Sequence, residues 1–318
     1  MTREWQVFCL SGESLYGKTF LALLIGNMCF WFSTSLFMPV LPLYYHQLGF
    51  SEGEIGLAVG AFSVGALAFR FSAGKAIDRY GSKPVLTAGM LLSLVAVACY
   101  PLGGTLLTIT LFRLLHGIGI SGYGAAALTT TSMLFPESKT TEAVSMYALF
   151  TMIGAGLATS IALTLYDEKG FMGVVWCGIA VTAASLVLFP KSKASKRTAN
   201  NAAVAVWPVI SRPSVMLPAV NLFIVNFSFS TLMTFLPLFV LLYGGGGIGY
   251  FFVAYAVAVV LSRMVVTRVC KLVSSPRLTL YLMIVFGAIM LFMAYWHSPL
   301  ALALAGVALG IAFGFAFP

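Results

Sequence analysis

Charged side chains are scarce along this chain. Asp, Glu, Lys and Arg make up 8% of its 318 residues, whereas 60% of the residues are hydrophobic. A soluble globule of this length needs much more polar surface to cover its apolar interior. The scarcity of charge therefore excludes a soluble globular protein and predicts a chain that lies in a lipid bilayer.

Acidic residues are the rarer charge: the chain has nine Asp and Glu but 18 Lys and Arg, which gives a net charge of +9. A basic chain can indicate a nucleic-acid partner, so the positions of the basic residues matter. Nearly all fall on one side of the expected spans; only Lys169 falls in an outer loop and only Arg113 within a span. This asymmetry follows the positive-inside rule. We therefore expect no nucleic-acid partner, and a multi-pass protein of the cell membrane with a cytoplasmic N-terminus and central loop.

Cysteines are few, and their spacing does not pair them. Cys9, Cys29, Cys99, Cys177 and Cys270 are scattered, most of them inside apolar runs. This pattern argues against disulfides and a cysteine metal site, and it predicts small buried apolar side chains. We expect no metal ion and no other cofactor.

Long apolar runs, by contrast, are abundant, and an expected span is long enough to cross about 30 Å of hydrocarbon. We divide the chain into an N-terminal segment (1–17), a six-helix bundle (18–190), a basic linker (191–212) and a partial second bundle with helices 7 to 10 (213–318). The first bundle has expected spans at 18–45, 55–73, 84–100, 105–128, 143–166 and a sixth ending at 190, with an inner loop at 135–142 and an outer loop at 167–170. The second has expected spans at 214–242, 248–268, 278–296 and from 300 onward.

The stretch from Gly74 to Lys83 is expected to form a tight turn between the second and third spans. A glycine at each end suits such a turn, because glycine ends a helix in the left-handed conformation at no steric cost. The run Gly-Lys-Ala-Ile-Asp-Arg-Tyr-Gly-Ser-Lys resembles the signature loop of the major facilitator superfamily, G-x-x-x-D-R-x-G-R-K. The residues in register are Gly74, Asp78, Arg79, Gly81 and Lys83, whereas Ser82 stands where the family usually has a basic residue.

This resemblance implies an all-α integral membrane protein, built from two pseudo-symmetric six-helix bundles, that moves a solute by alternating access. It assigns the five matching residues to a conformational switch, in which the loop aspartate meets the inner end of an eleventh helix. It also implies a proton gradient as the energy source. The expected partners are the lipid bilayer and a small-molecule substrate.

An internal repeat supports the two bundles. Ile55-Gly56, Arg70 and Gly117 recur as Ile248-Gly249, Arg263 and Gly310, all at one shift of 193 residues. A common shift is the pattern that a duplicated bundle predicts. The register of this repeat predicts about ten helices up to Pro318 and a further two, helices 11 and 12, after it. A truncated, non-transporting membrane protein or regulatory remnant is therefore one alternative to a transporter.

Arg113, His116, Gly117 and Gly119 form an Arg-x-x-x-Gly-x-Gly run in the fourth expected span. It resembles the helix-4 motif of the family's drug and proton antiporter branch, which implies that Arg113 faces the central cavity and serves proton coupling or substrate charge. An arginine at mid-bilayer costs about 2.5–3.5 kcal/mol on insertion scales, so it needs water, a partner or a substrate. His116 lies one turn away and is of a residue type that carries protons near neutral pH. The alternatives are an arginine satisfied by carbonyls and a neutral buried histidine.

Polar residues recur at helical spacing in the first and seventh spans, so that those of each span share one face. Such pseudo-symmetric faces predict a substrate cavity near the bilayer midplane. The residues expected to line this cavity are Asn27, Trp31 and Ser35, then Asn226 and Ser230, with Tyr147, Phe150 and Tyr255 as aromatic walls. An apolar lining with one cation favours an amphipathic or anionic solute over a sugar.

The sequence therefore predicts a secondary active transporter, not an enzyme, that exports a small organic solute in exchange for protons. An uptake permease of the same fold is the alternative for direction, because the fifth span offers Gly154-Ala-Gly156 without the proline of drug exporters. None of the nine acidic residues falls deep in an expected span, which weakens proton antiport unless Arg113, His116 and Asp78 suffice. Gly12 to Thr19 matches the phosphate-loop pattern GxxxxGKT, but with no strands readable for a sheet behind it we expect no ATP.

Overall fold

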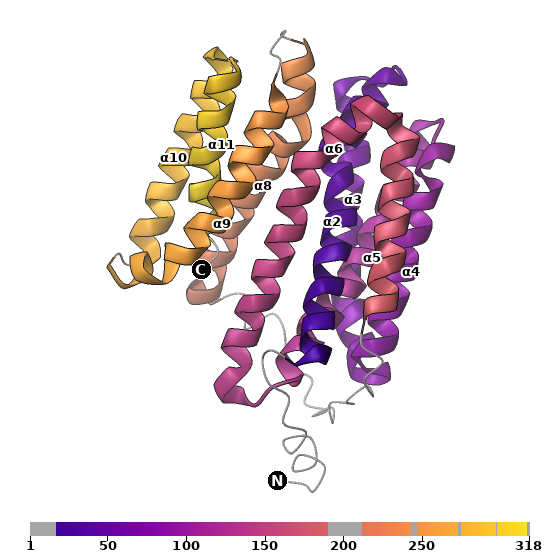
Figure 1. The fold of residues 1–318 in the computed structure, drawn as a ribbon, viewed down its shortest axis with the longest axis vertical. Coiled ribbons are helices and arrows are strands. Elements are labelled where there is room, and N and C mark those ends of the chain that lie inside the picture. Colours follow the sequence, from indigo (N-terminus) through magenta and orange to yellow (C-terminus); the bar gives the residue numbers. More distant parts are fainter. Residues whose placement is uncertain (1–16, 190–211, 243–246, 273–274, 297, 317–318) are drawn as a thin grey trace, which may run out of the picture. The chain divides into compact units, whose positions relative to one another are not determined.

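The structure, a computed structural model, describes residues 17–189, 212–242, 247–272, 275–296 and 298–316, and in these ranges nearly every residue is helical (Figure 1). Five helices in these ranges are long and apolar enough to cross a membrane, and shorter apolar helices lie in the C-terminal part. This arrangement confirms the all-α fold class.

The N-terminal part contains five α-helices, of which the last is bent back on itself. Their bounds are α2 (Lys18–Gln47), α3 (Glu52–Tyr80), α4 (Ser82–Cys99), α5 (Leu106–Met133) and α6 (Glu137–Leu188), with a short 3-10 turn, η1 (Tyr100–Leu102), after α4. Within α6 the backbone leaves helical geometry at Gly170, where φ is 66°. The residue divides α6 into the two helices that the sequence predicted there.

The C-terminal part contains four α-helices. They are α8 (Pro213–Leu242), α9 (Ile248–Leu272), α10 (Ser275–Tyr295) and α11 (Pro299–Ala316). In the described residues, nine labelled α-helices, one of them double, thus give the ten helical segments expected from the apolar runs.

The chain divides into two compact units. The N-terminal unit takes in α2 to α6, apart from the short stretches Met38–Leu43 and Thr159–Leu163, which group with the second unit. The C-terminal unit contains α8 to α11. All site geometry reported below lies within one unit or the other.

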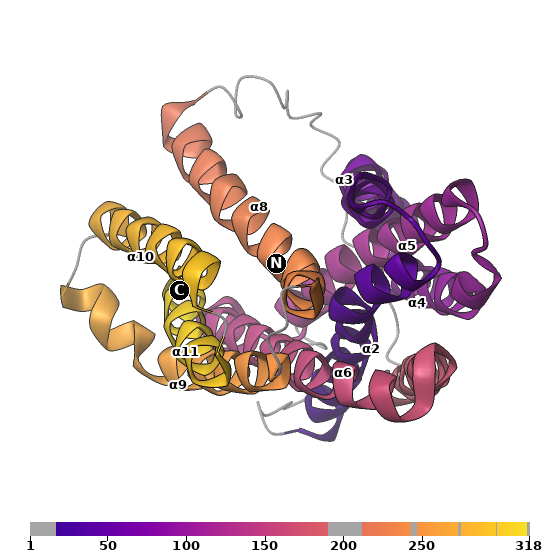
Figure 2. The same cartoon turned by 90° about the horizontal axis from the view of Figure 1, so that it is seen from above.

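Helix α5 lies between α3 and α4 in the N-terminal unit, and glycines bring the three backbones close together (Figure 2). A Cβ atom added at Gly65 of α3 would overlap the carbonyl of Leu114 in α5. On the other side of α5, a Cβ at Gly89 of α4 would lie 2.6 Å from the carbonyl oxygen of Gly119. Glycine is required at these positions because any side chain would push the helices apart.

The same crossing is built twice in the chain. A Cβ at Gly117 would meet the carbonyl of Phe62 and the amide nitrogen of Ala66, both in α3. In the C-terminal unit, a Cβ at Gly310 of α11 would meet the carbonyl oxygen of Tyr255 at 2.6 Å and the amide nitrogen of Val259 at 3.1 Å, both in α9. Each of the three residues lies 193 positions after its counterpart, so the shift found in the sequence is the shift of a repeated packing contact.

Hydrogen bonds from hydroxyl groups connect α2 to the second helix of α6. Ser33 donates a hydrogen bond to the carbonyl of Gly178 at 2.8 Å, and Thr182 donates to Ser33 at 2.7 Å. Ser185 donates to the carbonyl of Gly26 at 2.6 Å. In an apolar environment such bonds between helices replace the hydrophobic attraction that water would supply, so α2 and α6 are held in one register.

The expectations for the inner loop and for the burial of the cysteines were wrong. The polar stretch 135–142 was expected to be a loop, but α6 begins at Glu137 and the connection from α5 is only Leu134–Pro136. The three described cysteines, Cys29, Cys99 and Cys177, are free but only partly buried. Cys9 and most of the Gly12–Thr19 pattern lie outside the described residues, and so does the side chain of Cys270. The last two residues of the pattern, Lys18 and Thr19, begin α2.

Candidate functional site

The connection between α3 and α4 is a corner of one residue. Helix α3 runs on through Tyr80, and α4 begins at Ser82. Between them Gly81 has φ 88° and ψ 164°, and its amide donates to the carbonyl of Ile77 at 2.8 Å. The glycine expected to end the helix is therefore Gly81. The expectation for Gly74 was wrong, because Gly74 lies inside α3 and, apart from its own stretch of the helix, no described atom lies within 4 Å of a Cβ built there.

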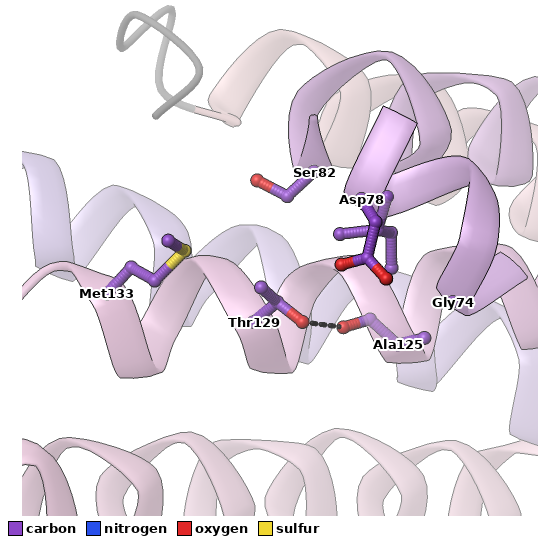
Figure 3. Close-up of a pocket in the computed structure, with 7 residues that line it drawn as sticks. Gly74, Asp78, Ser82, Ala125, Thr129 and Met133 are labelled. Carbon is purple, nitrogen blue, oxygen red and sulfur yellow. Dashed lines mark hydrogen bonds between the residues drawn. The ribbon is translucent and has the colours of Figure 1, made fainter. Parts of the chain in front are cut away.

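A hollow of about 150 Å³ lies beside this corner, where the ends of α3, α4 and α5 meet (Figure 3). Its lining consists of Gly74, Ile77, Asp78, Ser82, Ala125, Thr129 and Met133. Figure 3 shows the Asp78 carboxylate directed toward α5, where Thr129 donates to the carbonyl of Ala125 at 2.8 Å. Asp78 and Arg79 are exposed, and the Arg79 guanidinium lies 5.2 Å from the ring centre of Tyr80. Lys83, the second residue of α4, is half-buried.

Ser82, which replaces the family's usual basic residue, is buried. It accepts a hydrogen bond of 2.9 Å from the hydroxyl of Thr130 in α5. A buried position with a neutral partner does not suit a cation, so a serine at this place is explained by the packing of α4 on α5.

Replacing Gly81 by Ala is expected to destabilise the protein by about 1–3 kcal/mol, because only glycine adopts its backbone angles without strain. Gly74→Ala, in the same signature run, is expected to leave stability unchanged or slightly raised, since alanine favours a helix. Thermal unfolding of the two purified variants in detergent measures the difference. Equal unfolding temperatures would show that the corner does not need glycine.

Arg113 is buried in the N-terminal unit, with 5% of its surface exposed, about 10 Å along α5 from its first residue. Its guanidinium donates to the Tyr100 hydroxyl at 3.3 Å and to the Val59 carbonyl at 3.4 Å. The guanidinium carbon lies 4.5 Å from the centre of the Phe62 ring. None of these described partners carries a negative charge, so the cation is solvated only by dipoles and an aromatic face.

His116 lies on the same face of α5, one turn further on, and is 1% exposed. Its Nδ1 atom is 2.6 Å from the Tyr100 hydroxyl, and its ring is 5.4 Å from the ring of Phe62. The structure therefore brings together Arg113 and His116, the two residues that the sequence predicted for proton coupling or substrate charge. It joins them through a tyrosine.

Tyr100 was not among the residues predicted from the sequence. It lies in η1, outside any helical period that includes Arg113, and an aromatic residue at the end of a span is common at the membrane interface. Its burial, at 1% exposed, is the feature that separates it from an interfacial tyrosine, and burial is not visible in the sequence.

A second polar cluster is centred on Asn27 of α2, which has no exposed surface. Its amide nitrogen donates to the Thr151 hydroxyl at 2.8 Å and to the Tyr147 carbonyl at 3.3 Å, both in α6. Its amide oxygen accepts from the Tyr123 hydroxyl of α5 at 3.1 Å. The structure thus joins Asn27 to Tyr147, and adds Tyr123 and Thr151, which the sequence analysis missed.

The other residues expected to line the cavity are placed as follows. Ser35 is buried, and Trp31 and Phe150 are half-buried against the apolar core of the N-terminal unit, which includes Tyr147. In the C-terminal unit, Asn226 is exposed and Ser230 half-buried on α8. The ring of Tyr255 is 5.7 Å from that of Phe229 and 6.2 Å from that of Phe313. Their shared role in binding a substrate stays a prediction.

Comparison with known proteins gives a family match over most of the chain. Residues 23–318 match the sequence model of the Major Facilitator Superfamily. The chain is 25% identical over 256 residues to the staphylopine export protein of Staphylococcus aureus strain Mu50, which covers 77% of this chain and 64% of that protein. It is 26% identical over 287 residues to the multidrug efflux protein YfmO of Bacillus subtilis strain 168, covering 86% of this chain and 70% of that protein.

A solved structure matches the fold. The chain resembles a bacterial homolog of the human lysosomal transporter Spinster in an inward-facing, unoccupied conformation, with a TM-score of 0.72. The two are 15% identical, and the match covers 94% of this chain and 73% of the other. The likeness extends across both units, each of which contains the crossing with the 193-residue shift.

Proposed function

This chain belongs to the Major Facilitator Superfamily and is a membrane-embedded transporter, and from this premise we propose that it exports a small organic solute in exchange for protons. The single observation that carries the proposal is the Arg113 cluster. A buried cation and a histidine share one hydroxyl, and the cation's acceptors in the described part of the chain are neutral.

The chemistry of the cluster suits a coupling site. A buried charge with neutral partners raises the free energy of the protein. Water, an anion or a change of conformation that solvates the charge lowers it again. Next to the charge, His116 is the only one of the chain's three histidines that lies within the middle of an apolar helix of the described residues. A histidine beside a cation binds and releases a proton according to the field that the cation imposes, so movement of Arg113 would change its proton affinity.

The solute is best matched by an amphipathic organic molecule with a negative group. The buried Nε atom of Arg113 has no hydrogen-bond partner among the described residues, so a donor for an anion is available there. The Phe62 ring lies 4.5 Å from the guanidinium carbon and is an apolar group beside the cation, of the kind that the rest of an organic solute could contact. Outward direction is supported by the relatives named for export and efflux, in which this chain finds its sequence likeness.

The experiment uses inverted membrane vesicles from cells that express the full gene product, with a panel of amphipathic organic acids as probes. Proton release on adding a probe is followed with a pH-sensitive dye after the vesicles are acidified inside. If the solute enters in exchange for protons, protons leave the vesicles and the quenched fluorescence of the dye recovers. Vesicles without the protein should show no such recovery. Quenching that deepens would indicate coupled movement in the opposite sense, as in an uptake permease, and no response to any probe would favour the non-transporting alternative.

Replacing His116 by Gln is expected to lower probe-dependent proton release at least tenfold at normal protein level. The amide of Gln can still bond to Tyr100, but it does not bind a proton near neutral pH. His46→Gln, in the last turn of α2, removes an imidazole outside the cluster and is the matched control. Unchanged proton release in the His116 variant would remove this residue from the coupling mechanism.

A further inference from the structure

One hydroxyl group lies between the two candidate coupling residues. The Tyr100 oxygen is 3.3 Å from an Arg113 guanidinium nitrogen and 2.6 Å from His116 Nδ1. Tyr100 is in η1 and the other two residues are in α5, so the contact depends on how the turn after α4 packs against α5. All three side chains are at least nine-tenths buried.

The direction of the two hydrogen bonds follows from the chemistry of the groups. A guanidinium has donors only, so the Tyr100 oxygen must accept from Arg113. A tyrosine hydroxyl has one proton to give, and His116 Nδ1 is the nearest acceptor at 2.6 Å. If Nδ1 carried a proton instead, the Tyr100 oxygen would face two donors and its own proton would be left without this acceptor, which is unfavourable in a buried site.

The surroundings of His116 supply few other groups that could change this assignment. The charged and titratable neighbours are Arg113 on α5 and Tyr100 in η1. Tyr45 on α2 interacts electrostatically with these two residues. The fourth neighbour, Phe62 of α3, offers the edge or face of an apolar ring. Among these described neighbours, Tyr100 alone bonds to Nδ1.

We infer that Tyr100 is a positioning residue: it accepts from Arg113, donates to Nδ1 of His116, and thereby keeps the neutral imidazole in the tautomer with its proton on Nε2. The consequence is that Nε2 is the atom that presents a proton to its surroundings, while Nδ1 is occupied. A proton enters at Nδ1 only when the Tyr100 hydroxyl turns away, so the position of Arg113 and the protonation of His116 change together. Only this last step rests on the proposed transport function.

Nitrogen NMR of the histidine ring tests the tautomer without any transport assay. The full chain is purified with His46→Gln and His297→Gln, so that the signals of His116 are the only imidazole signals of the protein. The expected result is a single neutral form with the proton on Nε2. A proton on Nδ1 in this parent protein would overturn the inference directly, whether or not further variants fold.

Tyr100→Phe in the same background removes the hydroxyl and keeps the ring. We expect it to give a mixture of both tautomers, because nothing then fixes Nδ1 as an acceptor. Tyr45→Phe is the matched control, since the Tyr45 hydroxyl is buried but has no hydrogen-bond partner among the described residues; its spectrum should equal that of the parent. An unchanged spectrum in the Tyr100 variant would also overturn the inference.

In chains with all three histidines, Tyr100→Phe is expected to lower probe-dependent proton release about tenfold, and Tyr45→Phe by less than twofold. The two failures are distinguishable. If the wild-type protein releases no protons with any probe, the proposed exchange fails while the spectra still decide the tautomer. If wild type is active and Tyr100→Phe is as active, Tyr100 has no part in coupling.

Discussion

Arg113→Ala is expected to reduce probe-dependent proton release by thirtyfold or more, which corresponds to about 2 kcal/mol. The guanidinium is the charged member of the buried cluster, and alanine removes its bonds to Tyr100 and Val59 together. The protein level and unfolding temperature are expected to stay close to those of the parent. The reason is that the insertion cost of an arginine, about 2.5–3.5 kcal/mol, is relieved by the same change that removes its contacts.

Arg113→Lys is the matched variant, because it keeps the charge and loses the planar fork. A lysine ammonium reaches one acceptor well but does not span two in fixed geometry, so we expect activity between those of the parent and the alanine variant. Normal flux in Arg113→Ala at a normal protein level would show that this arginine only fills space and bonds to carbonyls. In that case the charge in α5 would have no part in the mechanism.

Gly65→Ala is expected to destabilise the N-terminal unit by about 1–3 kcal/mol, because the added methyl group overlaps the backbone of α5 at Leu114. The neighbour is a carbonyl of a helix, which cannot turn aside as the end of a side chain can. The two helices must separate along their crossing, and the contacts of Arg113 with Val59 and Phe62 of α3 would be lost as well. Thermal unfolding in detergent measures the loss.

Gly60→Ala provides the control within the same helix, since no described atom beyond the neighbouring turns of α3 lies within 4 Å of a Cβ at that position. We expect its unfolding temperature to equal or slightly exceed that of the parent, because alanine is the better helix former. Gly310→Ala should repeat the effect of Gly65→Ala in the C-terminal unit. If Gly65→Ala and Gly60→Ala unfold at the same temperature, the helices do not cross as closely as the structure shows.

Most of the helix positions could be predicted from the sequence, because a span of fixed thickness demands an apolar run of known length. Helix α9 begins at Ile248 as expected, and α8 begins within one residue of its expected start. Boundaries failed where polar residues belong to a helix. The first five residues of α6 include Glu137, Lys139 and two threonines, which are typical of a loop in composition but belong to the start of a helix.

The candidate site was predictable to the extent that its residues share a helix. Arg113 and His116 are three positions apart on α5, and periodicity alone places them on one face. Tyr100 could not be found in this way, because η1 and the connection after it interrupt the helical period between it and Arg113. For Asn27 the helical face was identified, but the partners on α5 and α6 depend on tertiary packing.

The two copies of the glycine crossing differ in one physical respect. At the shift of 193 residues, Arg113 corresponds to Gly306 of α11 and His116 to Leu309, so one copy contains an arginine and a histidine where the other has neither. A membrane voltage exerts a force on a charge in its field, about 2.3 kcal/mol for each charge moved across 100 mV, and exerts none on a glycine. The α3–α5 crossing can therefore respond to voltage through Arg113, whereas the α9–α11 crossing has no charge at the matching position.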